Sequence, residues 1–148
     1  MEESVISKNS SGDPYQMNGL TLAYIGDAVF ELMVREHMIE NGFRQANKLH
    51  KHTTAAVNAG TQSRMSMAVM DMLNDMELAV YKRGRNSAPM TSAKHQTISD
   101  YRRATGLEAL FGYLYLKGDE ERLKEIFEKC MESIEEEASD AKDAVADQ

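Results

Sequence analysis

The chain has one cysteine, two prolines and no tryptophan among its 148 residues, and it also lacks long apolar runs. A single cysteine, Cys130, cannot form an intramolecular disulfide or a cysteine-rich zinc site, so we expect a reducing, cytoplasmic location. No apolar run approaches the roughly 18 residues of a membrane span, so no membrane partner is expected. The first residues, MEESVISKNSSGDPYQ, also lack the apolar segment of a signal peptide.

Methionine is abundant, with 11 residues, and together with the shortage of proline it suits a helical protein with an adaptable core. Apolar residues recur at helical spacing, and no strand pattern or internal repeat is present. We therefore predict one all-α domain over residues 18–137, preceded by a flexible lead over 1–17 and followed by a disordered acidic tail over 138–148.

Glycine, asparagine and the apolar period predict where the helices begin and end. The expected helices cover 18–43 with a stop at Gly42, 45–75 with a break near Gly60, 75–83 with a cap at Asn74, 99–118 and 119–137. Between them, the composition of 84–97 predicts a loop that begins where the helical pattern fails, at Gly84.

The net charge of −7 is unevenly distributed. Residues 119–148 contain 12 acidic and 4 basic side chains, whereas residues 1–118 contain 13 basic and 12 acidic ones. Within 82–103, six cations accompany one acid, Asp100. Because a polyanion responds to the local charge, this segment is a candidate RNA-binding surface, although an ordinary solvated cluster explains the same composition. The predicted RNA-binding residues are Lys82, Arg83, Arg85, Asn86, Arg102 and Arg103.

Two carboxylates stand in strongly apolar helical segments. Asp27 lies within LAYIGDAVFELMV, and Glu108 lies within GLEALFGYLYL. Glycines accompany both acids, and a glycine inside a helix is tolerated where another backbone or a ligand comes close. If the two helices pack together, one cation between Asp27 and Glu108 would offset their desolvation. The alternative is that each acid lies at the edge of its apolar stripe, and Glu31 is either a supporting acid or a surface residue.

Oxygen ligands in small number favour Mg²⁺, which keeps several waters and meets substrate phosphate. Zinc is disfavoured because there is no HExxH and because His37, His50, His52 and His95 lack a ligand spacing supported by cysteine. We expect His50 and His52 to be solvated, with contact to an RNA backbone as the alternative. Di-iron chemistry would need Glu-x-x-His pairs, and these are missing, as is a P-loop.

The two acidic motifs resemble those of the ribonuclease III endonuclease domain. LAYIGDAVFELMV is similar to the family signature, and ATGLEALFGYLYL is similar to its second acidic motif. The short chain and KRGRN before YR are similar to the Mini-III branch of that family. Asp27 matches the signature aspartate and Glu108 the glutamate of the second motif. The chain departs from the larger enzymes by having Leu20, Ala23 and Thr105 where those enzymes have acids.

This resemblance implies a helical homodimer that hydrolyses double-stranded RNA with Mg²⁺ and leaves 5′-phosphate and 3′-hydroxyl ends. We expect the dimer to form through the Asp27 helix with Tyr24 near the contact, and burial of Tyr24 in the core is the alternative. The resemblance assigns Asp27 and Glu108 as catalytic metal ligands. It further implies maturation of the large-subunit (23S) ribosomal RNA precursor in the bacterial cytoplasm, and it leaves open a ribosomal-protein helper. Two other functions remain open: a non-catalytic RNA-binding homologue, and a helical interaction module that uses the acidic last helix.

Overall fold

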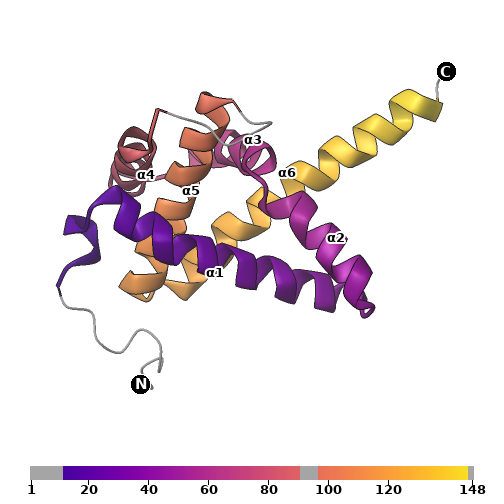
Figure 1. Cartoon of the computed structure of the whole chain (residues 1–148), viewed down its shortest axis with the longest axis horizontal. Coiled ribbons are helices and arrows are strands. Elements are labelled where there is room, and N and C mark those ends of the chain that lie inside the picture. The colour runs from indigo at the N-terminus through magenta and orange to yellow at the C-terminus, as the bar shows by residue number, and fades with distance from the viewer. Residues whose placement is uncertain (1–11, 91–96, 147–148) are drawn as a thin grey trace.

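The computed structural model describes residues 12–90 and 97–146, with side chains to Glu135, and these residues form helices and no strands (Figure 1). The predicted all-α class is confirmed. None of the described helices is both long and apolar enough to cross a membrane. In chain order the elements are η1 Pro14–Gln16, α1 Gly19–Glu40, α2 Ala46–Val57, α3 Ala59–Val69, η2 Met70–Met72, α4 Asp75–Ser87, α5 Ile98–Lys117 and α6 Glu120–Ala146.

Side-chain caps begin five of the described α-helices, because a short polar side chain satisfies a backbone N–H of the first turn that has no partner within the helix. At α6, Oδ1 of Asp119 accepts from the Arg122 N–H at 3.1 Å. Asn18, Asn58, Asn74 and Thr97 each accept from the third residue after them. The break between α2 and α3 therefore falls at Asn58, two residues before the predicted Gly60. Left-handed glycines follow α1 and α5, where φ is 93° at Gly42 and 81° at Gly118.

Gly84 does not end its helix, and this prediction was wrong. Helix α4 continues to Ser87, so residues 84–87 are not part of a loop. A Cβ atom at Gly84 would lie 2.5 Å from Cβ of Ala109 on α5. The glycine is therefore required by the close approach of α4 to α5 and not by a turn. Residues 91–96 of the predicted loop lie outside the described residues.

Both predicted terminal segments include helical residues where the structure describes them. Residues 12–17 include η1, and the Tyr15 ring packs edge-to-face on Tyr113 at 6.1 Å. Residues 1–11 lie outside the described part. At the other end α6 runs to Ala146 and extends beyond the other helices (Figure 1), so residues 138–146 of the predicted tail are helical here. The last two residues are not described.

Helix α5 lies at the centre of the fold and packs against α1, α3 and α4. Three aromatic rings join α1, α5 and α6: Phe30 meets Phe111 at 5.2 Å and Phe127 at 6.0 Å, both edge-to-face. Arg122 of α6 makes two 2.9 Å bonds to the buried carboxylate of Glu77 on α4. Because this ion pair is bidentate, it fixes the start of α6 against α4.

Helices α1 and α5 cross in direct backbone contact. A Cβ atom at Gly26 would lie 1.6 Å from the carbonyl oxygen of Glu108, and one at Gly112 would lie 2.0 Å from that of Leu22. No side chain fits in either space, so the two glycines permit the crossing. The inference from sequence that glycines mark a close approach is confirmed.

Replacing Gly26 by alanine should separate α1 from α5, because its methyl group would overlap backbone that cannot rotate away. We expect Gly26→Ala to lower the free energy of unfolding by about 3 kcal/mol, at the upper end of overpacking effects. The matched control is Gly60→Ala, whose Cβ would meet only the ends of two side chains, Oδ1 of Asn58 at 3.4 Å and Nη1 of Arg64 at 3.8 Å. That variant should be neutral or slightly more stable. Urea unfolding measures both, and equal effects would contradict the crossing.

Candidate active site

The α1–α5 crossing brings the two predicted carboxylates together. Asp27 follows the glycine that contacts the Glu108 carbonyl, and the two side chains are close enough for the charge of Asp27 to act on Glu108. Asp27 is exposed at the edge of α1, whereas Glu108 is half-buried on α5. The arrangement is therefore one acid at the surface and one below it, each positioned by helix backbone.

Both carboxyl groups hold their protons more tightly than ordinary acids. Burial, and secondarily the charge of Asp27, raises the pKa of Glu108 to about 8. Desolvation raises the pKa of Asp27 as well, with a smaller contribution from Glu31 one turn along α1. Burial and a neighbouring like charge both disfavour the ionised form of a carboxyl group, so each of the two acids keeps its proton to a higher pH.

Neither Asp27 nor Glu108 has a cationic partner among the described residues. Two uncompensated carboxylates side by side form a donor set that a metal cation would satisfy. No group of three or more Asp, Glu, His or Cys side chains that could hold a metal occurs in the described part of the chain. A cation on these two acids would therefore keep most of its coordination for water and substrate, which fits Mg²⁺ better than zinc.

The three positions that depart from the larger enzymes take no part in this donor set. Thr105 is buried, and its hydroxyl donates to the Tyr101 carbonyl one turn back at 2.9 Å. Ala23 is buried in the core, and Leu20 is exposed on α1. The residues that replace the acids at these three positions thus occupy ordinary helical environments, buried for Ala23 and Thr105 and exposed for Leu20.

The predicted RNA-binding cations lie on the end of α4 and the start of α5. Nε of Arg102 donates to the Arg85 carbonyl at 3.0 Å, which joins the two helices. Arg85 in turn donates to Asn86 at 3.2 Å, and Lys82 is exposed. Arg103 pairs with Asp100 of its own helix at 3.9 Å. The bond from Arg102 to Arg85 therefore brings the end of α4 against the start of α5, the helix that carries Glu108.

Arg83 differs from the other cations because it faces the N-terminal segment. Its Nη1 donates to the carbonyls of Tyr15 and, at 3.0 Å, Met17, and its guanidinium lies 5.0 Å from the Tyr15 ring centre. These contacts hold residues 12–17 on α4. Arg83 stays a predicted RNA contact, and its Nη1 also serves the fold, through a pairing with distant carbonyls that no local pattern reveals.

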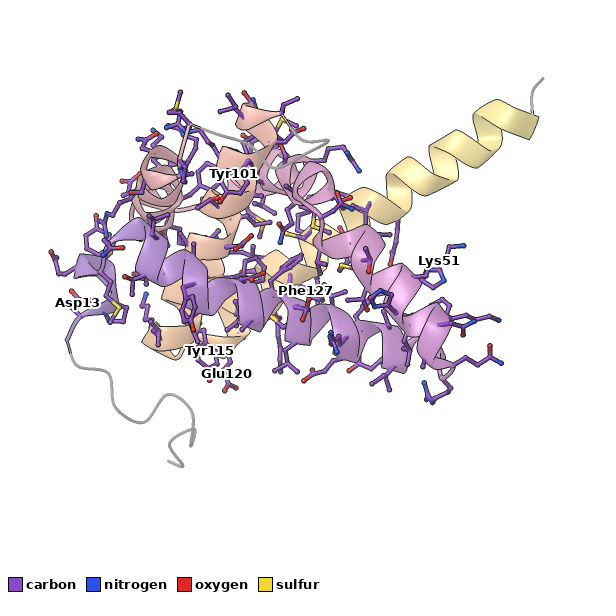
Figure 2. All side chains as sticks on the ribbon, viewed as in Figure 1. Asp13, Lys51, Tyr101, Tyr115, Glu120 and Phe127 are labelled. Atoms are coloured by element: carbon purple, nitrogen blue, oxygen red, sulfur yellow. The ribbon has the colours of Figure 1, made fainter. Side chains whose placement is uncertain are left out.

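Tyr24 points away from the core and is 85% exposed. Leu32, also exposed, lies on the same outer side of α1 and lines an apolar cleft of about 320 Å³ between α1, the end of α5 and the start of α6. Tyr115 and Glu120, together at the lower edge of the molecule in Figure 2, line it as well. Sequence singled out Tyr24 but missed the cleft, because its lining comes from three helices.

Cys130 takes no part in the site. It is fully buried in α6, and burial raises the pKa of its thiol to about 12. A thiolate is therefore inaccessible at neutral pH, and nucleophilic chemistry by this residue is excluded.

The helical fold and its two acids define a class of protein, and comparison with known families agrees. Residues 20–119 match the Ribonuclease III domain, so the chain belongs to the ribonuclease III domain family, whose members are endoribonucleases. Among curated relatives, the chain is similar to Mini-ribonuclease 3 of Clostridium tetani (48% identity; 84% of this chain, 83% of the relative) and of Brevibacillus brevis (44%; 85% and 94%).

A solved structure supports the same fold. The crystal structure of a protein from Fusobacterium nucleatum matches with a TM-score of 0.73 at 32% identity, and the match covers 82% of this chain and 98% of that one. The resemblance inferred from the two acidic motifs is thereby confirmed at the level of the family and of its fold.

The raised pKa of Glu108 predicts how stability of the metal-free chain depends on pH. Folded Glu108 retains its proton to a higher pH than unfolded Glu108 does. The resulting stabilisation is fully present below pH 4.5, the ordinary pKa of glutamate, and is lost as pH rises through about 8. Denaturant unfolding with EDTA should therefore show declining stability across that window. Glu108→Gln, which cannot ionise, should remove most of the decline. An identical pH profile for both proteins would contradict the assignment.

Proposed function

We propose that this protein is a homodimeric, Mg²⁺-dependent endoribonuclease that cleaves double-stranded RNA and leaves 5′-phosphate and 3′-hydroxyl ends. The observation that carries this proposal is the pair of uncompensated carboxylates at the α1–α5 crossing. Membership in the ribonuclease III family supports the reaction type. The Mg²⁺ dependence rests on the fit between two oxygen donors and a cation that keeps its waters.

Asp27 and Glu108 would hold the ion, which when bound supplies a nucleophile at neutral pH and offsets charge on the leaving 3′ oxygen. Because Asp27 is exposed, it would hold the cation on the side from which the scissile phosphate approaches. Glu108 is held by the α5 backbone beneath it and must lose its proton when the cation binds, so cation binding and proton release are linked.

Duplex RNA is recognised mainly by its shape, backbone and 2′-hydroxyls. The cations at the junction of α4 and α5 lie next to the Glu108 helix and suit contact with neighbouring phosphates. We assign Lys82, Arg83, Arg85, Arg102 and Arg103 to this contact. Arg83 and Arg102 each use one nitrogen for backbone carbonyls, and their remaining N–H groups can meet phosphate. We assign Asn86 to the same surface.

The Mini-III resemblance supports a particular substrate, the 23S ribosomal RNA precursor, processed in the cytoplasm. The relatives named Mini-ribonuclease 3 match over most of their length and of this chain, which supports the same role. A ribosomal-protein helper would belong to the same setting, since the precursor is assembled with ribosomal proteins while it is processed.

The dimer would form through the outer side of α1. Tyr24 projects from the surface as an isolated aromatic ring, and the apolar cleft beside Leu32 has a volume suited to an inserted side chain. A projection and a recess on one surface are self-complementary under two-fold symmetry, which is the requirement for an isologous dimer. The exposed apolar side chains would then be removed from water.

Substitution of the proposed metal ligand tests the reaction. Asp27→Asn keeps the shape of the side chain but removes its charge, so cleavage of perfect duplex RNA with Mg²⁺ should fall below about a tenth of the wild-type rate. Glu108→Gln should behave similarly, while the matched Glu31→Gln should have a milder effect. Thermal unfolding checks that the variants fold. Substantial cleavage by Asp27→Asn, or cleavage by the wild type in EDTA, would refute the proposal.

Substitution of the projecting aromatic ring tests the dimer. Because Tyr24 is exposed in a single subunit, Tyr24→Ser should leave the subunit fold intact yet shift the mass in light scattering from twice 16.6 kDa toward the monomer. The control is Met67→Ser, which removes another exposed apolar side chain, from α3. A monomeric wild type across micromolar concentrations would rule out the dimer.

A further inference from the structure

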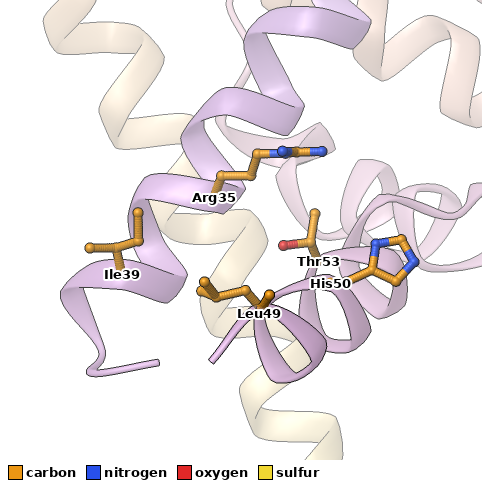
Figure 3. A pocket seen from close by; sticks show the side chains of 6 residues that line it. Arg35, Ile39, Leu49, His50 and Thr53 are labelled. Carbon is orange, nitrogen blue, oxygen red and sulfur yellow. The ribbon is translucent and has the colours of Figure 1, made fainter. Parts of the chain in front are cut away.

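A second cleft lies between α1 and α2, away from the carboxylate pair and from the basic surface of α4 and α5. Its volume is about 280 Å³. Figure 3 shows Arg35 and Ile39 reaching in from α1, with Leu49, His50 and Thr53 on α2. The lining consists of Arg35, Ile39, Ala46, Leu49, His50 and Thr53.

The turn between the two helices holds this cleft in shape. Arg44 donates to the Ile39 and Phe43 carbonyls at the end of α1. The Phe43 ring lies 4.2 Å from the His52 ring, on α2, which closes the corner. The Arg44 bonds tie the turn to the end of α1, and the Phe43–His52 contact ties the turn to α2, so the angle between the helices is set independently of any ligand.

The chemistry of the lining is divided. Leu49, Ile39 and Ala46 supply an apolar wall, while Arg35, His50 and Thr53 supply hydrogen-bond donors. A guanidinium and an imidazole beside a hydroxyl suit a phosphate, and the apolar wall suits the carbon atoms of a sugar. The volume lies just below the range of small-molecule sites, so it fits about one nucleotide unit.

Arg35 is linked to the carboxylate site along α1. Asp27, Glu31 and Arg35 follow at intervals of four residues and therefore lie along one side of the helix. The rise along the helix axis from Asp27 to Arg35 is about 12 Å. Nη2 of Arg35 lies 3.3 Å from Oε2 of Glu31, and both side chains are exposed. An exposed pair of this spacing contributes only about 0.3–0.5 kcal/mol, so a phosphate can replace Glu31 as the partner of Arg35.

We propose that the α1–α2 cleft binds one ribose-phosphate unit of the RNA strand, with Arg35 and His50 contacting its phosphate. The inference rests on the proposed function, since it places this unit on the same side of α1 as the scissile phosphate at Asp27. Contact at two points along α1, Asp27 and Arg35, fixes the direction of the strand across the site. The cleft therefore determines which phosphate reaches Asp27, so Arg35 is a positioning residue.

The test measures duplex RNA binding in an Asp27→Asn background, in which the substrate stays uncut. Arg35→Met keeps the aliphatic stem and removes the charge, and it should weaken binding about tenfold, as expected for loss of a charged hydrogen bond. The salt dependence of log K should flatten by about one. The matched control is Lys51→Met, an exposed cation on α2 outside the cleft lining (Figure 2), whose binding should stay unchanged.

Duplexes with a single neutral methylphosphonate at each position in turn identify the bound phosphate. At one position, the methylphosphonate should weaken binding to the protein that retains Arg35. The same methylphosphonate should have no further effect on binding to Arg35→Met, because the two changes remove the same contact. Equal losses for Arg35→Met and Lys51→Met, with no coupled phosphate, would overturn the proposal. So would an Arg35-dependent site for free nucleoside monophosphate that does not compete with duplex RNA.

Cleavage by the protein with native Asp27 separates this proposal from the proposed function. If duplex RNA is cut with Mg²⁺ but Arg35→Met leaves affinity and salt dependence unchanged, the cleft assignment fails and the nuclease assignment stands. If duplex RNA is bound with the Arg35 coupling but never cut, the reverse holds. Absence of any duplex binding overturns both.

Discussion

The close crossing of α1 and α5 is the contact on which the rest of this structure depends. Gly26 and Gly112 let two backbones meet where any side chain would overlap a carbonyl oxygen. That contact places Asp27 and Glu108 next to each other, although separation would suit their charges better. The fold thus holds two acids together in a desolvated place, where Glu108 keeps its proton to a pKa of about 8, and the burial of large apolar side chains around α5 stabilises the whole. A bound cation would take the place of that proton, so the cost is confined to the place where chemistry is proposed.

Helix α1 carries a separate task on each of its sides. Its inner side packs on α5 and α6 through Phe30, one edge carries Asp27, and its outer side exposes Tyr24. Its last turns form a cleft with α2. One helix therefore connects the core, the carboxylate pair, the proposed dimer contact and the proposed strand contact. In a chain of 148 residues, one rigid helix thus takes part in the core, in the carboxylate pair and in both proposed contacts.

Positive charge on this protein is divided between recognition and structure. Arg83 holds the N-terminal segment on α4, Arg102 joins α5 to the end of α4, and Arg122 is paired with buried Glu77. A count of cations along 82–103 consequently does not reveal that two of them also bind backbone carbonyls. Arginine can serve in both ways because its planar group binds several acceptors and remains charged.

The sequence by itself determined the helices and the two acids. Caps such as Asn74 and left-handed stops such as Gly118 act within a few residues, so local pattern predicts them. Asp27 and Glu108 were found because an acid beside glycine in an apolar helix conflicts with its surroundings. Only the tertiary structure decided what Gly84, Arg83 and Arg35 contact. Their partners are Ala109, two carbonyls of the N-terminal segment, and a cleft shared with α2, respectively. Each of these contacts joins separate elements, and helical spacing carries no information about which elements meet.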